Sequence, residues 1–359
     1  MVNYLEGVKD IKVYIWDSLD NMKPLADVRQ DGWFMNGEKE IVNIPDENLR
    51  KAIKESLGKK QEDKITRTDM ESLKELNSDS LPIIGTNRGI KDLTGLEYAI
   101  NLEFIDLSEN SISDLSPIKD LTKLKYIEVD RNDISDLTPL SNLKELEHLN
   151  IYNNAGIKDI KPISHLTNLK WIDMHFCNRK TAPVNVEELG TLANLEFLSI
   201  DDNFVEDISF VKNLSNLSTF SCNNNYVLDL SEADDLAARA FNDWSGDYFV
   251  NMYGQALKKP VEVKVSSEGT TFGMDDPVTG NKKCKEKVEE EVGVQVPVIE
   301  PFEEVDFLEV RYNHDNNKIE LIISENDTDE VRKLEYAIFA EYGMYSLKII
   351  FNITQEAKK

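Results

Sequence analysis

The chain has 359 residues, of which 40% are hydrophobic and 30% are charged, as in a folded protein rather than a disordered one. Its formal net charge is −26, from 41 basic and 67 acidic residues. A chain this acidic is repelled by phosphate groups, which excludes nucleic acids and anionic membrane surfaces as partners. The length predicts two or three domains.

Residues 1–40 are predicted to be a β-arm or the remnant of a preceding domain, because apolar residues from Val8 to Ile15 mostly alternate with polar ones. No apolar run is long enough for a transmembrane helix, and the first residues lack the basic start and apolar core of a signal peptide. The chain opens within a domain and ends directly after a strand-like segment. We therefore expect it to be a segment of a longer, secreted protein.

Residues 41–82 are predicted to be a helical cap. Pro and acidic residues directly before Leu49 favour a helix start, apolar residues follow at helical spacing, and Gly58 is a stop. Thr68 and Glu71 predict a capping box at the start of a second helix. Such a cap would cover the apolar end of a repeat stack, which is otherwise exposed to water.

Residues 83–240 contain a repeat with the frame L-x-x-L-x-L-x-x-N-x-I-x-D-L. Its asparagine recurs every 22 residues at Asn110, Asn132 and Asn154, and the same column continues as Cys177, Asn203 and Asn225. This period and frame predict a leucine-rich-repeat solenoid, whose coils bury their apolar sides against one another. The asparagines are expected to satisfy buried backbone groups at each turn.

Two further features of the repeats concern their turns. Cys177 replaces the asparagine and precedes an eight-residue excursion over 178–185, where we expect a bulge or longer loop. An aspartate column recurs in the frame, and each carboxylate is expected to accept backbone N–H groups in its own turn. That column comprises Asp92, Asp114, Asp136, Asp159, Asp207 and Asp229.

The sequence after the repeats changes character twice. Residues 241–260 are aromatic and irregular and are predicted to be a connector. Residues 261–359 contain strand-like segments, two of them joined by a turn at 314–317, and are predicted to form a small β-sandwich. The predicted strands are 261–265, 305–312, 318–323, 337–342 and 346–353.

The cap string IPDENLRKAIKESLG, the entry string GIKDLTGLEYAINLEFIDLSENSISDLSPI and the 22-residue coils resemble internalin-type proteins of Firmicutes over roughly residues 41–260. The resemblance implies an α/β leucine-rich-repeat solenoid with parallel strands on its concave face and short 3-10 or turn segments on its outer arcs. It also implies an N-terminal helical cap and a C-terminal all-β immunoglobulin-like sandwich. Two departures are Cys177 with its excursion and the lack of a sorting signal or wall-binding repeat.

The resemblance further implies export, attachment to or release from the cell surface, and binding of macromolecules, often host receptors, through the concave face. Frame positions 3, 5 and 7 should point to that face, because strand side chains alternate. They place rings and acids side by side, which favours recognition of a basic protein by a monomer. The candidate ligand-binding residues are Phe104, Asp106, Tyr126, Glu128, Asp130, His148, Tyr152, Trp171, Asp173, His175, Phe197 and Asp201.

Alternatives remain at this stage. The rings could only pack along one another and shield the sheet, in which case the repeats are a structural spacer or adaptor; sugar stacking on the rings is a further alternative. Enzymatic motifs are absent from the sequence, and we predict no catalytic residue and no cofactor. His148 and His175 lie roughly 13 Å apart along neighbouring strands and cannot share a zinc ion. A weak calcium site at Asp106, Glu128 and Asp130 is the remaining metal hypothesis.

Overall fold

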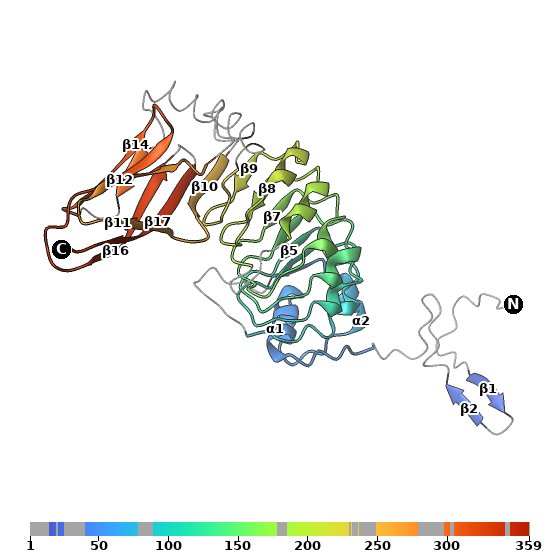
Figure 1. Ribbon diagram of the computed structural model, residues 1–359. Coiled ribbons are helices and arrows are strands. Elements are labelled where there is room, and N and C mark those ends of the chain that lie inside the picture. Colours follow the sequence, from blue (N-terminus) through green and yellow to red (C-terminus); the bar gives the residue numbers. More distant parts are fainter. Residues whose placement is uncertain are drawn as a thin grey trace.

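The computed structural model of the chain describes residues 14–18, 21–24, 40–77, 89–177, 185–229, 231, 236, 249–278, 298–301, 305–341 and 345–358. It contains a curved solenoid with two short helices at one end and a β-domain at the other (Figure 1). Short strands follow the inner side of the curve, and 3-10 turns lie on the outer side. The predicted fold, a capped leucine-rich-repeat solenoid with a β-sandwich behind it, is confirmed.

Near the N-terminus, β1 (Tyr14–Ser18) and β2 (Asn21–Pro24) form an antiparallel hairpin. The strand that we predicted from Val8 to Ile15 overlaps this hairpin only at its end, and its other residues lie outside the described part of the chain.

The first cap helix, α1 (Glu47–Ser56), starts and stops where the sequence predicts. Its N-cap is Asp46, whose carboxylate accepts hydrogen bonds from the backbone N–H groups of Asn48 at 2.9 Å and Leu49 at 3.0 Å. The chain leaves the helix through Gly58 in the left-handed conformation, φ 62°. Leu49 is fully buried, so the apolar face of α1 closes the end of the repeat core.

The second cap helix, α2 (Arg67–Ser72), begins two residues earlier than predicted. Its capping box is formed by Thr66 and Asp69, not by Thr68 and Glu71. The Thr66 hydroxyl accepts from the Asp69 N–H at 3.3 Å, and the Asp69 carboxylate accepts from the Thr66 N–H at 2.7 Å. A shorter acidic side chain therefore closes the box, which the S/T-x-x-E pattern does not anticipate.

Among the described residues, seven short parallel strands from β3 to β9 form the inner wall of the repeats, and each pairs with the next at a constant register. The first of them lies before residue 83, where we had placed the start of the repeats, so the solenoid begins inside the predicted cap. The strands are β3 (Glu75–Asn77), β4 (Phe104–Asp106), β5 (Tyr126–Glu128), β6 (His148–Asn150), β7 (Trp171–Asp173), β8 (Phe197–Ser199) and β9 (Thr219–Ser221).

The outer arcs are 3-10 segments, and the aspartate column fixes the backbone conformation of the turn that leads into them. Each of these carboxylates accepts the backbone N–H two residues further on, for example Asp114 from Ser116 and Asp136 from Thr138, both at 2.8 Å. The turns are therefore structural, as predicted. The segments are η2 (Leu96–Tyr98), η3 (Ser116–Ile118), η4 (Thr138–Asn142), η5 (Lys161–Ile163), η6 (Val186–Thr191) and η7 (Ser209–Asn213).

The asparagine column joins successive coils. The amide of Asn154, which is fully buried, accepts the Ile134 N–H at 3.0 Å and donates to the carbonyls of Val129 and Ile151, both at 2.9 Å. Cys177 cannot accept in the same way, although its thiol contacts the Ile151 carbonyl at 3.2 Å. Its predicted excursion lies outside the described residues, apart from its last residue.

Residues Phe249–Ala256, where we predicted an irregular connector, form strand β10 instead. β10 pairs in parallel with β9. Gln255 occupies the place of the next residue in the asparagine column: its side-chain oxygen accepts the Val227 N–H at 3.0 Å. This extra coil was not predicted, because it has glutamine instead of asparagine and because Gln255 follows Asn225 by more than 22 residues.

The C-terminal domain consists of two sheets. In one, β13, β16, β17 and β11 continue the repeat sheet through β10, which pairs with β17. In the other, β12, β15 and β14 are antiparallel, and β14 and β15 form the predicted hairpin. The sequence missed β12 and β13. The strands are β11 (Val261–Val265), β12 (Thr270–Asp275), β13 (Val298–Pro301), β14 (Leu308–Asn313), β15 (Lys318–Ile323), β16 (Arg332–Glu341) and β17 (Tyr345–Gln355).

Candidate functional site: the concave face of the repeats

The inner wall of the solenoid presents alternate side chains to solvent. In β5, Ile127 is fully buried whereas Tyr126 and Glu128 are partly exposed, and the other repeat strands follow the same alternation except that Ser199 is also buried. Because the strands pair in register, side chains at one frame position form a continuous column. We call this surface the concave face. All twelve residues predicted from the sequence lie in its columns at positions 3, 5 and 7.

Position 3 forms an uninterrupted stack of rings, which we call the ring ladder. Adjacent rings are nearly parallel, with interplanar angles from 9° to 16° and centroid distances of 4.5, 3.8, 4.0 and 4.6 Å. The rings therefore cover one another's faces and present their edges to solvent. Stacked pairs of this kind contribute about 0.5–1.5 kcal/mol each beyond the buried area. The members, in order, are Phe104, Tyr126, His148, Trp171 and Phe197.

Glu128, at position 5, is tied to the ring ladder. Its carboxylate accepts the Tyr126 hydroxyl at 2.7 Å and lies 2.8 Å from Nε2 of His148. Burial raises the pKa of Glu128, but the hydrogen bonds from His148 and Tyr126 outweigh burial, so the pKa lies below its ordinary value. Burial and the same carboxylate raise the pKa of Tyr126, which holds the phenol in its protonated, donating form.

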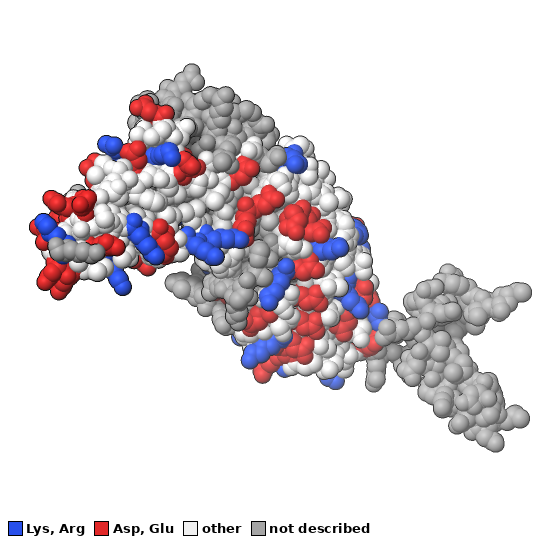
Figure 2. Space-filling view, in the orientation of Figure 1, with Lys and Arg blue, Asp and Glu red and all other residues white. Residues whose placement is uncertain are grey.

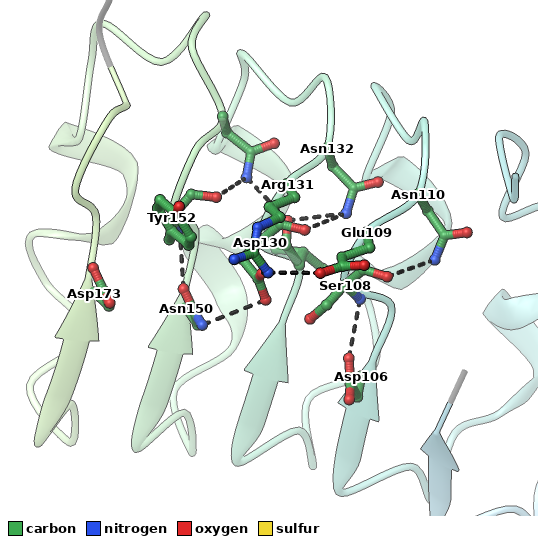
Figure 3. A network of polar contacts seen from close by, with 12 residues as sticks. Asp106, Ser108, Glu109, Asn110, Asp130, Arg131, Asn132, Asn150, Tyr152 and Asp173 are labelled. Carbon is green, nitrogen blue, oxygen red and sulfur yellow. Dashed lines mark hydrogen bonds and ion pairs between the residues drawn. The ribbon is translucent and has the colours of Figure 1, made fainter. Parts of the chain in front are cut away.

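Asp130, at position 7, has the opposite shift. It is only 6% exposed, and burial together with the nearby charges of Glu128 and Asp106 raises its pKa, although bonds from Ser108 and the charge of Arg131 act the other way. Asn150 donates to it at 3.4 Å (Figure 3). The concave face thus contains a carboxylate that is costly to keep ionised.

A second group of rings lies beside the ring ladder, at the ends of the strands. Tyr152 stacks on His175 at 3.7 Å, and His175 lies 2.8 Å from the Asp173 carboxylate. The guanidinium of Arg131 lies over the Tyr152 ring, 4.9 Å from its centroid, while it pairs with Glu109 at 2.7 Å (Figure 3). The Phe176 ring is tilted against both of these rings, 6.3 Å from Tyr152 and 5.3 Å from His175. We call Arg131, Tyr152, His175 and Phe176 the rim cluster.

Sequence reasoning missed Arg131 and Phe176 as members of this surface. Both adopt positive φ, 51° and 55°, one residue before the asparagine column, where the strand turns and the alternation of side chains no longer holds. Side chains at this position share no size or chemistry, so the repeat frame held no signal for them; the members are Glu109, Arg131, Asn153, Phe176, Asp202 and Asn224.

The metal hypothesis gains no support. Within the residues that the structure describes, no three or more His, Cys, Asp or Glu side chains are arranged to hold a metal ion. His148 and His175 belong to separate stacks, each with its own carboxylate partner. Over the same residues, no helix is long and apolar enough to cross a membrane.

Comparisons with known proteins agree with this description. A family model for leucine-rich repeats, two copies, matches residues 100–142. The crystal structure of internalin C2 from Listeria monocytogenes is 28% identical, covers 61% of this chain and 90% of its own, and has a TM-score of 0.52. None of the curated proteins matches the chain by sequence.

Two further solved structures are similar. InlP from Listeria monocytogenes, 16% identical, covers 87% of this chain and 96% of its own at a TM-score of 0.51, which shows a shared fold. InlF, an internalin from the same species, is 22% identical and covers 62% of this chain and 74% of its own at a TM-score of 0.43. Folds of this type are commonly protein-interaction modules. The repeat frame, the helical cap and the likeness to internalin C2 together show a leucine-rich-repeat protein that resembles internalins.

Proposed function

We propose that this chain is a non-enzymatic, monomeric binding protein that works outside the cell and recognises a protein ligand through the concave face. The observation that carries the proposal is the ring ladder with a row of carboxylates beside it on one open wall. Aromatic rings dominate the energetics of protein interfaces, and an ordered surface costs little entropy to use. Whether the ligand is a host surface protein is part of the proposal.

The charge of the face favours a basic partner. Five candidate side chains are carboxylates, namely Asp106, Glu128, Asp130, Asp173 and Asp201, and the whole chain carries −26. Several are already paired, Glu128 with His148 and Asp173 with His175, so the attraction is spread over the wall rather than focused on one residue. Such a field acts mainly on association rate and partner choice.

The stacking geometry argues against sugar binding. A sugar ring packs on the open face of an aromatic ring, but Tyr126, His148 and Trp171 each have another ring on both faces. A protein partner can instead use ring edges, which carry partial positive charge and meet carbonyl oxygens and other rings edge-on. Glycan arrays should accordingly give no signal that depends on the ring ladder.

A structural role is the second candidate, because the same stacking also favours it. Rings that cover one another stabilise the sheet without any ligand, as a spacer or adaptor domain would require. Replacing several rings by alanine does not separate the two functions, since lost stacking lowers stability in either case. The test needs substitutions that keep the stack and change only what a partner meets.

Trp171→Phe and Glu128→Gln meet this requirement. The first keeps a ring between its neighbours and removes the wider indole edge; the second keeps the side-chain shape and removes the charge. The probe is a panel of purified cell-surface ectodomains, measured by biolayer interferometry. We expect an ectodomain with a basic surface to bind, with tenfold or greater loss in each variant. Trp171→Phe should leave the melting temperature nearly unchanged, whereas Glu128→Gln should lower it slightly, because it removes the charge that the bonds from His148 and Tyr126 stabilise; binding is therefore measured well below both melting temperatures.

The matched control is Tyr226→Ala. This ring forms a stacked pair with Phe204, at 5.9 Å, outside the columns of the concave face. The control should lower the melting temperature slightly and leave binding unchanged. If no ectodomain binds the wild-type chain, or if Trp171→Phe and Glu128→Gln both bind as tightly as the wild type, the recognition proposal is wrong and the spacer function stands.

A further inference from the structure

We infer that the partner-binding surface extends beyond the repeats onto the solvent-facing side of β16 and β17 in the C-terminal domain, the side that continues the concave face, where the same protein partner makes a second contact. This inference rests on the proposed function, since it names where else the partner of the concave face is held. The side chains concerned lie on β16 and β17, outside the leucine-rich repeats.

The first argument is register. In β10, Asn251 pairs with Ser221 and continues column 5 of the concave face, whereas Met252 points to the core and pairs with Tyr345 of β17. After a bulge, Ala256 pairs with Lys348 on the open side. The open side of β17 is therefore the same side of one hydrogen-bonded sheet as the concave face.

The second argument is what this side presents. Ala337 pairs with Ile350, and Phe339 pairs with Lys348, across β16 and β17. All four side chains are partly exposed, while the residues between them, such as Ile349, are fully buried. We call Ala337, Phe339, Lys348 and Ile350 the β16–β17 patch. It combines an apolar centre with one cation, a composition suited to an interface.

The third argument is rigidity at the junction. The Tyr345 hydroxyl, in the core, donates to the Val227 carbonyl of the last coil at 2.6 Å, and the Gly254 N–H donates to the Ser346 hydroxyl at 2.8 Å. Gly254 has φ 68°, and a Cβ there would overlap the side chain of Asn224. The orientation of the two domains is therefore fixed before a partner binds, so a joint surface costs little ordering entropy.

The fourth argument is size. Neighbouring strands are ~4.8 Å apart, so β16 lies about four strand spacings, roughly 19 Å, from β8. Phe339 is also displaced along the strands, because it is level with Ala256, seven residues beyond Phe249, the partner level of Phe197; at ~3.3 Å per residue this adds about 23 Å, and the two rings are roughly 30 Å apart. A typical protein interface covers about 800 Å² on each partner, a patch roughly 30 Å across. A partner domain centred between Phe197 and Phe339, over β10, therefore spans both the C-terminal end of the ring ladder and the patch. Figure 1 shows β16 and β17 on the inner side of the curve, whereas β12 and β14 lie on the outer side.

Charge distinguishes the two parts of this surface. Acidic side chains predominate over the repeats on the side shown in Figure 2, whereas basic and acidic side chains lie close together over the C-terminal domain. A partner with a basic area for the repeats and an apolar area with a carboxylate for the patch would match both parts.

The experiment uses the full chain and the ectodomain that binds it most tightly in a ladder-dependent manner in the panel described above. Ile350→Asp and Lys348→Glu change the patch, and Ile322→Asp, on the outer face of the other sheet, is the matched control. We expect each patch variant to weaken binding by about tenfold, and the control to have no effect at equal melting temperature. Hydrogen exchange of the complex should show protection in β16 and β17.

The outcomes separate the two proposals. Binding that is lost in Trp171→Phe but unchanged in both patch variants, without protection in β16 and β17, overturns the extension alone. A panel without any ladder-dependent ectodomain overturns the extension together with the proposed function. If Ile350→Asp lowers the melting temperature, Lys348→Glu, which changes only charge on an exposed side chain, decides the result.

Discussion

Removing Trp171 tests how much the ring ladder stabilises the solenoid. In Trp171→Ala the indole loses its stacks with His148, at 4.0 Å, and Phe197, at 4.6 Å. At about 0.5–1.5 kcal/mol per stacked pair, the loss of stacking alone should lower the free energy of unfolding by about 2 kcal/mol, and the lost apolar burial adds to this minimum. For a cooperative unit of 150–250 residues this corresponds to a melting temperature lower by roughly 4–8 °C.

Urea unfolding followed by far-ultraviolet circular dichroism measures this loss, with the free energy taken by linear extrapolation. Thr219→Ala, in the same column one coil beyond the rings, is the control and should cost less than about 0.5 kcal/mol.

A double-mutant cycle isolates the stacking energy. Trp171→Ala and Phe197→Ala should couple by about 0.5–1.5 kcal/mol, whereas Phe104→Ala and Phe197→Ala, at opposite ends of the ladder, should be additive within about 0.5 kcal/mol. Equal coupling in the two cycles would refute the stacking explanation, because a general weakening of the fold does not depend on which rings touch.

Three further changes have defined outcomes. Asn154→Ala leaves the buried Ile134 N–H without its partner, whereas the Val129 and Ile151 carbonyls keep the Asn132 amide and the Cys177 thiol; the change should cost about 1–3 kcal/mol in urea unfolding, and a cost below about 0.5 would mean that water replaces the amide. The folded-state pKa of Glu128 lies below the ordinary value of a glutamate, so its stabilisation is present above that ordinary value and is lost as pH falls through the folded pKa. Glu128→Gln should therefore flatten acid unfolding, and an unchanged acid profile would contradict the bonds to His148 and Tyr126. Burial raises the pKa of the Cys177 and Cys222 thiols, so iodoacetamide at about pH 8 should leave both unmodified in the native chain, as peptide mass spectrometry would show; labelling without denaturant would contradict their burial.

The periodic parts of the molecule were predictable because one physical rule repeats. A fixed frame of apolar residues places Ile105 and Leu107 inside and Phe104 and Asp106 outside, and each later coil obeys the same alternation. The columns of the concave face were therefore available from spacing alone. The twelve residues share one surface as predicted; that they bind a ligand stays a prediction.

The remainder depended on features that spacing does not encode. Sequence places Tyr126 beside His148 but does not say whether their rings face each other or a partner, which depends on side-chain torsions. Gln255 accepts a backbone N–H as the column asparagines do, but it lies outside the 22-residue spacing, so the repeat frame did not predict the last coil. Arg131 lies where the strand turns, beyond the reach of a period-two rule.

The ring ladder has a consequence for how such a surface can evolve. Each coil adds a single ring at a fixed step of ~4.8 Å, while the buried positions that hold the coil together are separate residues. Gain or loss of one 22-residue unit would lengthen or shorten the footprint by one ring without redesigning the interior. Single substitutions at column 3 would likewise change which partner is bound without changing the interior. Binding specificity can therefore evolve faster than the fold.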